Sequence, residues 1–482
     1  MEHLIKINLP GGLVSAGDLY EILLIAEKAG ADSIRFGNRQ QLYFSINEDR
    51  LEDLETEMLR TEIYFEIDND AQPNIVSSYV ADTIFNQESW LREGVYKGIL
   101  DSFDFQPRLK INMVDSQQTF VPFFSGNFNF ITSDISNYWY FYIRFPKSGK
   151  YFCFPSLVYS DDIPSLAKTA EEIIFGNKKL FYDQENTEDQ LFIKMLSKKA
   201  GATFQPITSG LKLPAFQLPY YEGFNKYNSW YWLGIYRRNE LFPIGFLKDA
   251  CQLCLKTHIG QLYTTPWKSI IIKGIEPSDR YEWGLLLSKY QLNVRHAANE
   301  LNWQVEDVCE EGLALKKQLV REFEEADLRT YQLCFAIKTQ PKTGLPGSVI
   351  IKKNKDGLYD LLHTKDFNPN SKDYEVYREA VQSDKLTAHL ISLCKNFYDR
   401  QSSHIDLAPA YQNKDSDPEK VPEQVYQCNN CLTRYDKQYG DSVNNIDKNI
   451  EFTALTDYYC PVCEAPKSEF SLVGLMEGFY QA

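Results

Sequence analysis

The sequence predicts an α+β protein built on a duplicated β-α-β-β-α unit and followed by a small metal-binding domain. One order of apolar strands and amphipathic helices occurs at the start of the chain and again near residue 230. Two Cys-x-x-Cys pairs, Cys428/Cys431 and Cys460/Cys463, lie near its end. With 482 residues, of which 43% are hydrophobic, the chain can hold several domains with large cores.

The first copy of the unit is expected within residues 1–66. Its predicted elements are, in order, strand 4–8, helix 15–29, strands 33–36 and 41–46, and helix 51–59. Ser15 is a good N-cap for the first helix, and Gly30 is a good residue to end it. This order of elements is that of a ferredoxin-like half-domain.

The second copy is expected within residues 206–295. Its predicted elements are strand 230–236, helix 244–257, strands 260–263 and 269–272, and helix 282–289. At an offset of 228 residues the two copies align without a gap, with Leu13 on Leu241, Gly17 on Gly245, Leu19 on Leu247 and Arg39 on the turn at Trp267. The shared order of elements indicates a duplication.

Each copy is followed by a segment with mixed strand and helix patterns, predicted at 67–205 and 296–403. Residues 404–424 are polar and contain proline, which is typical of an extended linker. The small domain is predicted at 425–470. The tail 471–482 is too apolar to be free, and we expect it to pack against either the small domain or the larger part of the chain.

Charge and cysteine usage narrow the class of protein. A net charge of −15 and a pI near 5.1 argue against binding to nucleic acid or to an anionic membrane. With neither a signal peptide nor an apolar run long enough to span a bilayer, we expect a cytoplasmic protein. Ten cysteines in so long a chain do not make a disulfide framework. Cys251 and Cys254 share a predicted helix face and are expected in its core.

The two terminal Cys-x-x-Cys pairs predict a mononuclear metal site. Four thiolates converge if the segment folds into two facing loops, and such a site binds one metal ion in tetrahedral sulfur geometry. This geometry suits both iron and zinc. The 28 residues between Cys431 and Cys460 exceed the usual gap of a structural zinc ribbon, which is the alternative class.

Around the cysteines stand five aromatic residues: Tyr426, Tyr435, Phe452, Tyr458 and Phe470. With the cysteine spacing, they make residues 425–470 resemble a rubredoxin. The resemblance implies one iron ion, ferrous or ferric, held by Cys428, Cys431, Cys460 and Cys463. Three positions depart from the family pattern: Leu432 and Glu464 stand where rubredoxins usually carry glycine close after each pair, and Tyr458 stands where they carry tryptophan.

Residues 1–403 resemble the sirohaem-dependent nitrite/sulfite reductases, in which two ferredoxin-like half-domains alternate with two halves of a cofactor-binding module. The similar segments are Ser33–Gln40, Asn74–Ser78, Pro107–Ile111 and Thr264–Trp267. The order of these segments, rather than any one of them, carries the resemblance. It implies an α+β body of four segments.

The cofactor motifs of that family are not present in this sequence. Its four-iron cluster needs a C-x5-C pair and a later C-x3-C pair, whereas here only Cys309 and Cys334 fall in those regions. We therefore expect sirohaem and the four-iron cluster to be absent. Arg39, Arg108 and Lys110 stand at matching basic positions, where they would bind an anion or sirohaem, or serve as ordinary ion-pair partners.

The leading hypothesis is an electron-transfer protein without catalytic residues, whose reductase-like body is a scaffold or a docking module for a redox partner such as a nitrite, nitrate or sulfite reductase. One alternative is an active sirohaem-type reductase with the rubredoxin as its built-in electron donor. Another is a zinc-binding assembly factor without redox activity.

Overall fold

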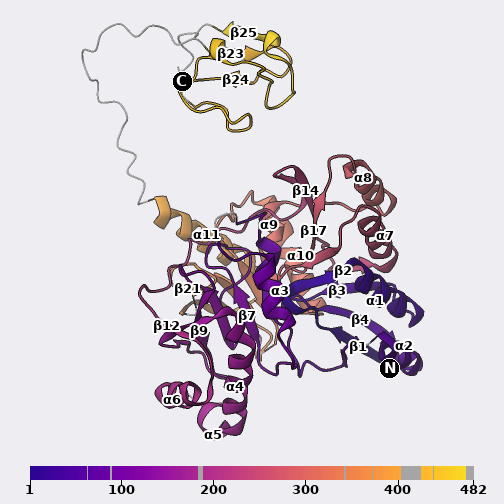
Figure 1. Cartoon of the computed structure of the whole chain (residues 1–482), viewed down its shortest axis with the longest axis vertical. Helices are drawn as coiled ribbons and strands as arrows, with labels where there is room; N and C mark the ends of the chain where they lie inside the picture. The colour runs from indigo at the N-terminus through magenta and orange to yellow at the C-terminus, as the bar shows by residue number, and fades with distance from the viewer. Residues whose placement is uncertain are drawn as a thin grey trace. The chain divides into compact units, whose positions relative to one another are not determined.

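The computed structural model describes residues 1–61, 63–86, 89–182, 188–340, 344–371, 373–402, 425–437 and 439–473. The chain divides into two compact units, residues 1–404 and 405–482 (Figure 1). All seven tryptophans, from Trp90 to Trp303, belong to the first unit. The predicted linker and residues 474–482 of the predicted tail lie outside the described residues.

The predicted duplication is confirmed. The first half-domain contains β1 (Glu2–Ile7), β2 (Leu13–Ser15), α1 (Ala16–Lys28), β3 (Ser33–Phe36), β4 (Leu42–Asn47), α2 (Leu51–Thr61) and β5 (Phe65–Ile67). The second contains β13 (Gly223–Tyr227), β14 (Trp230–Ile235), β15 (Phe242–Pro243), α7 (Ile244–Lys256), β16 (Gln261–Thr264), β17 (Ile270–Ile275) and α8 (Arg280–Lys289). Elements β1, α1, β3 and β4 recur as β14, α7, β16 and β17, each starting 228 residues later.

The two half-domains exchange edge strands. Their sheets have the orders β15-β3-β4-β1-β5 and β13-β14-β17-β16-β2, so β15 completes the first sheet and β2 completes the second. Phe242 pairs with Ile34, and Val14 pairs with Leu262. Helices α1 and α7 pack side by side (Figure 1), and one hydrophobic core extends through both half-domains.

Helices α1 and α7 bury the faces that their sequences predict. The Ser15 side chain caps α1 by accepting a hydrogen bond from the Asp18 N–H at 2.9 Å. On α7, Cys251 and Cys254 are fully buried, as expected for core cysteines. Burial raises the pKa of the Cys251 thiol to about 12, so the thiol stays protonated and unreactive.

The first module is a mixed sheet of order β12-β11-β9-β8-β7-β6, in which β6, β7 and β8 are parallel and the others antiparallel. Its elements are β6 (Val76–Ser77), α3 (Glu93–Asp101), β7 (Ile111–Val114), β8 (Phe128–Thr132), β9 (Tyr138–Ile143), β10 (Phe152–Cys153), β11 (Ser156–Tyr159), α4 (Ile163–Gly176), α5 (Lys178–Phe181), α6 (Asp189–Lys199) and β12 (Phe204–Pro206). Strand β7 starts at Ile111, because just before it the Glu171 carboxylate accepts the backbone N–H groups of Arg108 and Leu109.

The second module repeats this arrangement with β18, β19 and β20 parallel and β21 and β22 antiparallel. Its elements are α9 (Ala298–Leu301), β18 (Trp303–Val305), α10 (Glu310–Glu325), β19 (Phe335–Lys338), β20 (Val349–Lys353), β21 (Tyr359–Thr364), β22 (Tyr374–Val381) and α11 (Leu386–Ser402). Short 3₁₀ helices connect the elements of the body: η1 (Pro10–Gly12), η2 (Glu48–Arg50), η3 (Tyr79–Ala81), η4 (Ser160–Asp162) and η5 (Ser383–Lys385).

The second unit is a small antiparallel sheet of order β24-β23-β25 with long loops. Its elements are β23 (Val425–Cys428), β24 (Arg434–Tyr435), η6 (Phe452–Ala454), η7 (Lys467–Glu469) and β25 (Phe470–Val473). Its core consists of Tyr435, Phe452, Leu455 and Tyr458, with Tyr426, Ile446, Ile450 and Phe470 packed against it. Residues 471–473 of the predicted tail belong to β25 and pair with β23. Among the described residues, no helix has the length and apolarity needed to cross a membrane.

Candidate metal centre

Two loops of the second unit, 428–433 and 460–465, have the same backbone hydrogen bonds. In each loop the N–H of the first cysteine donates to the carbonyl five residues later, at 2.8 Å. The carbonyl of the same cysteine accepts the N–H four residues later, at 2.9 Å. These two bonds close each Cys-x-x-Cys segment into a compact turn.

Both loops place the residue after the second cysteine in the left-handed backbone region. Leu432 has φ 62° and Glu464 has φ 59°. A side chain there costs about 1–2 kcal/mol because its Cβ approaches the following carbonyl oxygen. These are the positions at which rubredoxins usually carry glycine, so the loops keep the conformation that glycine favours although they carry leucine and glutamate.

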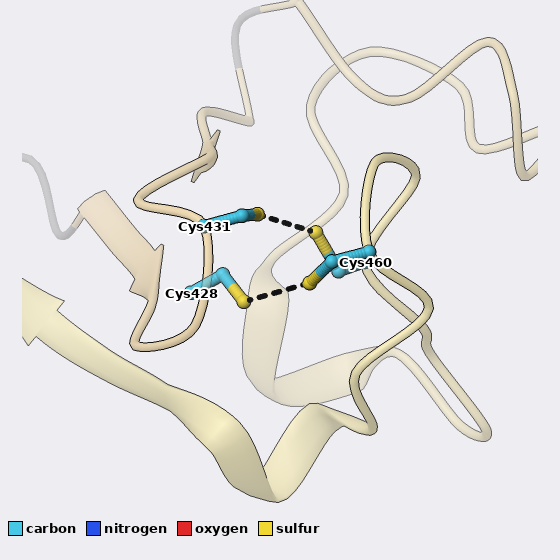
Figure 2. Close-up of side chains that lie close together, drawn as sticks. Cys428, Cys431 and Cys460 are labelled. Carbon is cyan, nitrogen blue, oxygen red and sulfur yellow. Dashed lines mark hydrogen bonds between the residues drawn. The ribbon is translucent and has the colours of Figure 1, made fainter.

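The four cysteine sulfurs converge. All four Sγ atoms lie within 4.8 Å of one another. The Sγ atoms of Cys428 and Cys463 are 3.6 Å apart, and those of Cys431 and Cys460 are 3.3 Å apart. Tetrahedral coordination with metal–sulfur distances of about 2.3 Å requires sulfur–sulfur distances of about 3.8 Å. Figure 2 shows Cys428 and Cys431 reaching from one loop toward Cys460 on the other, and the four thiols fit one metal ion.

The sulfurs differ in their exposure and hydrogen bonds. Cys428 and Cys460 are buried, Cys431 is half-buried and Cys463 is exposed. The Thr433 hydroxyl lies 3.1 Å from the Cys431 sulfur. This hydroxyl, followed by the Thr433 backbone N–H, lowers the pKa of the Cys431 thiol to about 6.

A polar network fixes the second loop against the aromatic core. Tyr458 donates its hydroxyl to the buried Asp441 carboxylate at 2.9 Å. Asn444 donates its amide to Asp441 at 2.8 Å and to the carbonyl of Tyr459 at 3.0 Å. Because Tyr459 directly precedes Cys460, this network holds one metal-facing cysteine in position.

In the body, Arg39 and Lys110 line one cavity of about 290 Å³. The Arg39 guanidinium donates to the carbonyls of Asn74 and Ile111 and to the side chain of Asn112. Burial lowers the pKa of Arg39 to about 10, and burial together with the nearby Arg39 charge lowers the pKa of Lys110 to about 8. Within the described part of the chain, the Lys110 ammonium has no hydrogen-bond or ion-pair partner.

Arg108 lies apart from these two residues and does not line the cavity. Its guanidinium pairs with Glu171 at 3.1 Å and lies 4.1 Å from the centre of the Phe175 ring. Glu171 and Phe175 both belong to α4. The structure therefore brings Arg39 and Lys110 together, whereas Arg108 holds α4 against the segment that precedes β7.

The charges that line this cavity decide whether it suits sirohaem. Besides Arg39 and Lys110, its lining includes three carboxylates, Asp70, Glu306 and Asp307. A macrocycle with eight carboxylates of its own needs an excess of cationic groups, whereas here three carboxylates outnumber Arg39 and Lys110. The residues present do not fit this group.

Cys309 and Cys334 have ordinary local partners. The Cys309 sulfur caps α10 by accepting the Gly312 N–H at 3.3 Å. Cys334 is buried, with its sulfur 3.9 Å from the carbonyl of Pro346. In the part of the chain that the structure describes, the only group of three or more clustered metal-ligating side chains is that of the four terminal cysteines.

Comparison with known proteins agrees with this geometry. Residues 425–470 match the rubredoxin family. Over 48 residues the chain is 42% identical to a probable rubredoxin, HupI, of Bradyrhizobium diazoefficiens, a match that covers 10% of this chain and 70% of that protein. The chain belongs to the rubredoxin family through its C-terminal domain. The structure of a rubredoxin from Guillardia theta is 28% identical over the matched part and covers 13% of this chain and 93% of that one, with a TM-score of 0.12.

The body, which is N-terminal to the rubredoxin domain, is similar to a second family. Residues 2–60 match the nitrite/sulfite reductase ferredoxin-like half domain. The structure of the Mycobacterium tuberculosis NirA protein superimposes with a TM-score of 0.62 and 13% identity, covering 83% of this chain and 81% of that chain. The predicted fold class is thereby confirmed. The segment boundaries drawn within the body stay predictions.

Sequence reasoning did not find every residue that shapes these sites. The contact of Thr433 with Cys431 and the link from Asp441 to the second cysteine loop depend on loop geometry. The position of Thr433, two residues after a metal-ligating pair, was the available signal for the first. For Asp441, the sequence offered no signal that sets it apart from the other acidic residues of the small domain.

Proposed function

We propose that the chain is an electron-transfer protein whose rubredoxin domain binds one iron ion through Cys428, Cys431, Cys460 and Cys463. The convergence of these four sulfurs within 4.8 Å of one another carries the proposal. An iron ion held by four thiolates supplies one-electron exchange between its ferrous and ferric states. The exposed Cys463 and half-buried Cys431 would offer the path to a partner.

The body would serve as a scaffold or as a docking module for a redox partner protein. Its NirA-like fold and its match to the nitrite/sulfite reductase half domain support a partner among nitrite, nitrate or sulfite reductases, or a reductase that supplies electrons. The poor fit of its cavity to an eight-carboxylate macrocycle supports a body without sirohaem. In this proposal no residue of the body is catalytic.

Metal analysis combined with absorption spectroscopy tests the proposal. Purified protein should contain one iron per chain and show ferric–thiolate absorption that dithionite removes. Cys463→Ser changes an exposed sulfur and should alter this spectrum, whereas Cys153→Ser, which changes a cysteine of the body, should leave it intact. Zinc without visible absorption would contradict the proposal and favour the assembly factor. A Soret band with reduction of nitrite would favour the reductase alternative.

The cavity at Lys110 favours a second candidate, in which the body binds a small anion. The charged groups around Lys110 are Arg39 and Arg144, which repel it, and Asp70 and Asp307, which attract it. Since the pKa of Lys110 is about 8, the side chain is cationic at pH 7 and mostly neutral at pH 9.

Calorimetric titration of the protein with sulfite or nitrite tests this candidate. We expect binding to weaken about tenfold or more from pH 7 to pH 9, because the ammonium charge is lost. Lys110→Gln should bind weakly at both pH values. Lys97→Gln, which removes an exposed lysine paired with Glu93, is the control and should keep the pH dependence. Equal binding by Lys110→Gln and the unaltered protein would exclude this role of Lys110.

A further inference from the structure

The two cysteine loops of the rubredoxin domain differ at one functional position. Their backbone hydrogen bonds have equal lengths, and both place the residue after the second cysteine at positive φ. Two residues after the second cysteine stands Thr433 in the first loop and Ala465 in the second. Only the first loop therefore has a hydroxyl at this place.

The Thr433 hydroxyl is directed at the Cys431 sulfur. The oxygen lies 3.1 Å from Sγ, and within the described part of the chain the hydroxyl makes no other hydrogen bond. When Cys431 is a metal-bound thiolate, its sulfur has no proton, so the hydroxyl must be the donor. Cys431 then receives a hydrogen bond from this hydroxyl, whereas Cys463 has no hydroxyl donor at the corresponding position.

We propose that Thr433 raises the reduction potential of the iron centre through its hydroxyl. This inference rests on the proposed function. On reduction one electron arrives from a one-electron donor, either a redox protein or dithionite. The net charge of one ferric ion with four thiolates changes from −1 to −2, and no proton moves. Because the added charge is shared with the sulfurs, a hydrogen bond to sulfur stabilises the reduced state more than the oxidised state.

The loop geometry indicates that Thr433 acts on the iron centre through the Cys431 sulfur, and that its side chain is not needed to pack the loop. Its side chain is half-buried, and its backbone carbonyl already holds the loop by accepting the Cys428 N–H, a bond that any residue can make. The same backbone carries alanine in the second loop, so the hydroxyl is not needed to form the turn. Removing the hydroxyl should thus change the potential without unfolding the domain.

The test compares Thr433→Val, which keeps the shape without the donor, with Thr433→Ser, which keeps the donor. At a fixed potential near the midpoint, we expect the ratio of reduced to oxidised centre to fall about three- to tenfold in Thr433→Val. For a one-electron couple this is a decrease of about 30–60 mV. Thr433→Ser should stay close to the unaltered protein. Potentials are measured by titration followed through the ferric–thiolate absorption, with iron content determined for each variant.

Each result has a defined meaning. An unchanged potential in Thr433→Val, or an equal decrease in Thr433→Ser, would overturn the role of the hydroxyl. If Thr433→Val does not bind iron, Thr433→Ala is measured in its place, because the second loop carries alanine there. Absence of iron–thiolate absorption in the unaltered protein would instead refute the proposed function.

Discussion

Leu432 and Glu464 are two of the residues at which this rubredoxin domain departs from the family pattern. Both backbones are left-handed, as glycine would be, although each carries a Cβ. The Leu432 side chain is 66% exposed, so the leucine projects into solvent beside Cys431 and is not forced into the loop. The cost at both positions therefore arises in the backbone and does not involve a clash with the core.

Glu464→Gly should stabilise the rubredoxin domain. Relief of the left-handed strain gains about 1–2 kcal/mol, while the greater freedom of glycine in the unfolded chain costs about 0.5–1 kcal/mol. The net gain in the free energy of unfolding is expected near 0.5–1 kcal/mol, measured by denaturant titration of the iron-loaded protein. Glu464→Ala is the matched control because it removes the carboxylate but keeps the Cβ. Equal stabilisation by both variants would assign the effect to charge and not to φ.

At the scale of the element, β2 and β15 connect the two copies of the half-domain. Each is a short strand directly before a helix, and each completes the sheet of the other copy. Neither sheet is complete without a strand from the opposite half, and one core passes through both. The half-domains are consequently one folding unit rather than two.

Dividing the body tests this dependence. Residues 1–210 and 211–402, separated at the exposed Gly210, should each fail to unfold cooperatively when made alone, because each lacks an edge strand and half of the shared core. Co-expression should give a complex that purifies together and unfolds in one transition. The whole body, residues 1–402, is the control. Cooperative unfolding of the isolated 1–210 piece would show that the exchanged strand is dispensable.

Some of these features can be predicted from the sequence and others cannot, for physical reasons. The helices and longer strands of both copies have clear apolar periodicity, and the cysteine spacing identifies the metal site directly. The exchange of edge strands is not predictable, because β2 and β15 are too short for their apolar pattern to indicate which strand each one pairs with. Arg108 resembles Arg39 and Lys110 in the sequence, yet Glu171, 63 residues further on, holds it elsewhere. The Thr433 contact requires a loop conformation that spacing alone does not give.

At the scale of the whole molecule, the two units depend on different sources of stability. The body has large cores, whereas the core of the rubredoxin domain contains four buried side chains with a few partly buried neighbours. A domain of this size generally needs a metal or a disulfide to remain folded. We therefore expect the metal to hold the rubredoxin domain folded and to contribute little to the body.

Removal of the metal tests this expectation. Treatment with a chelator under reducing conditions should abolish the thermal transition of the rubredoxin domain and leave that of the body within about 2 °C of its original midpoint. Cys428→Ser, which removes a buried ligand, should have the same effect without a chelator. Loss of the body transition in either sample would indicate that the two units are coupled.

The distribution of aromatic residues separates the optical signals of the two units. All seven tryptophans belong to the first unit, and the rubredoxin domain has Tyr458 where its family usually has tryptophan. Selectively excited indole fluorescence therefore reports on the body, while visible charge-transfer absorption would report on the iron centre. A ferric–thiolate chromophore absorbs the energy of a nearby excited indole. The degree to which tryptophan emission is quenched would therefore report the distance between the body and the rubredoxin domain. No dye would have to be attached.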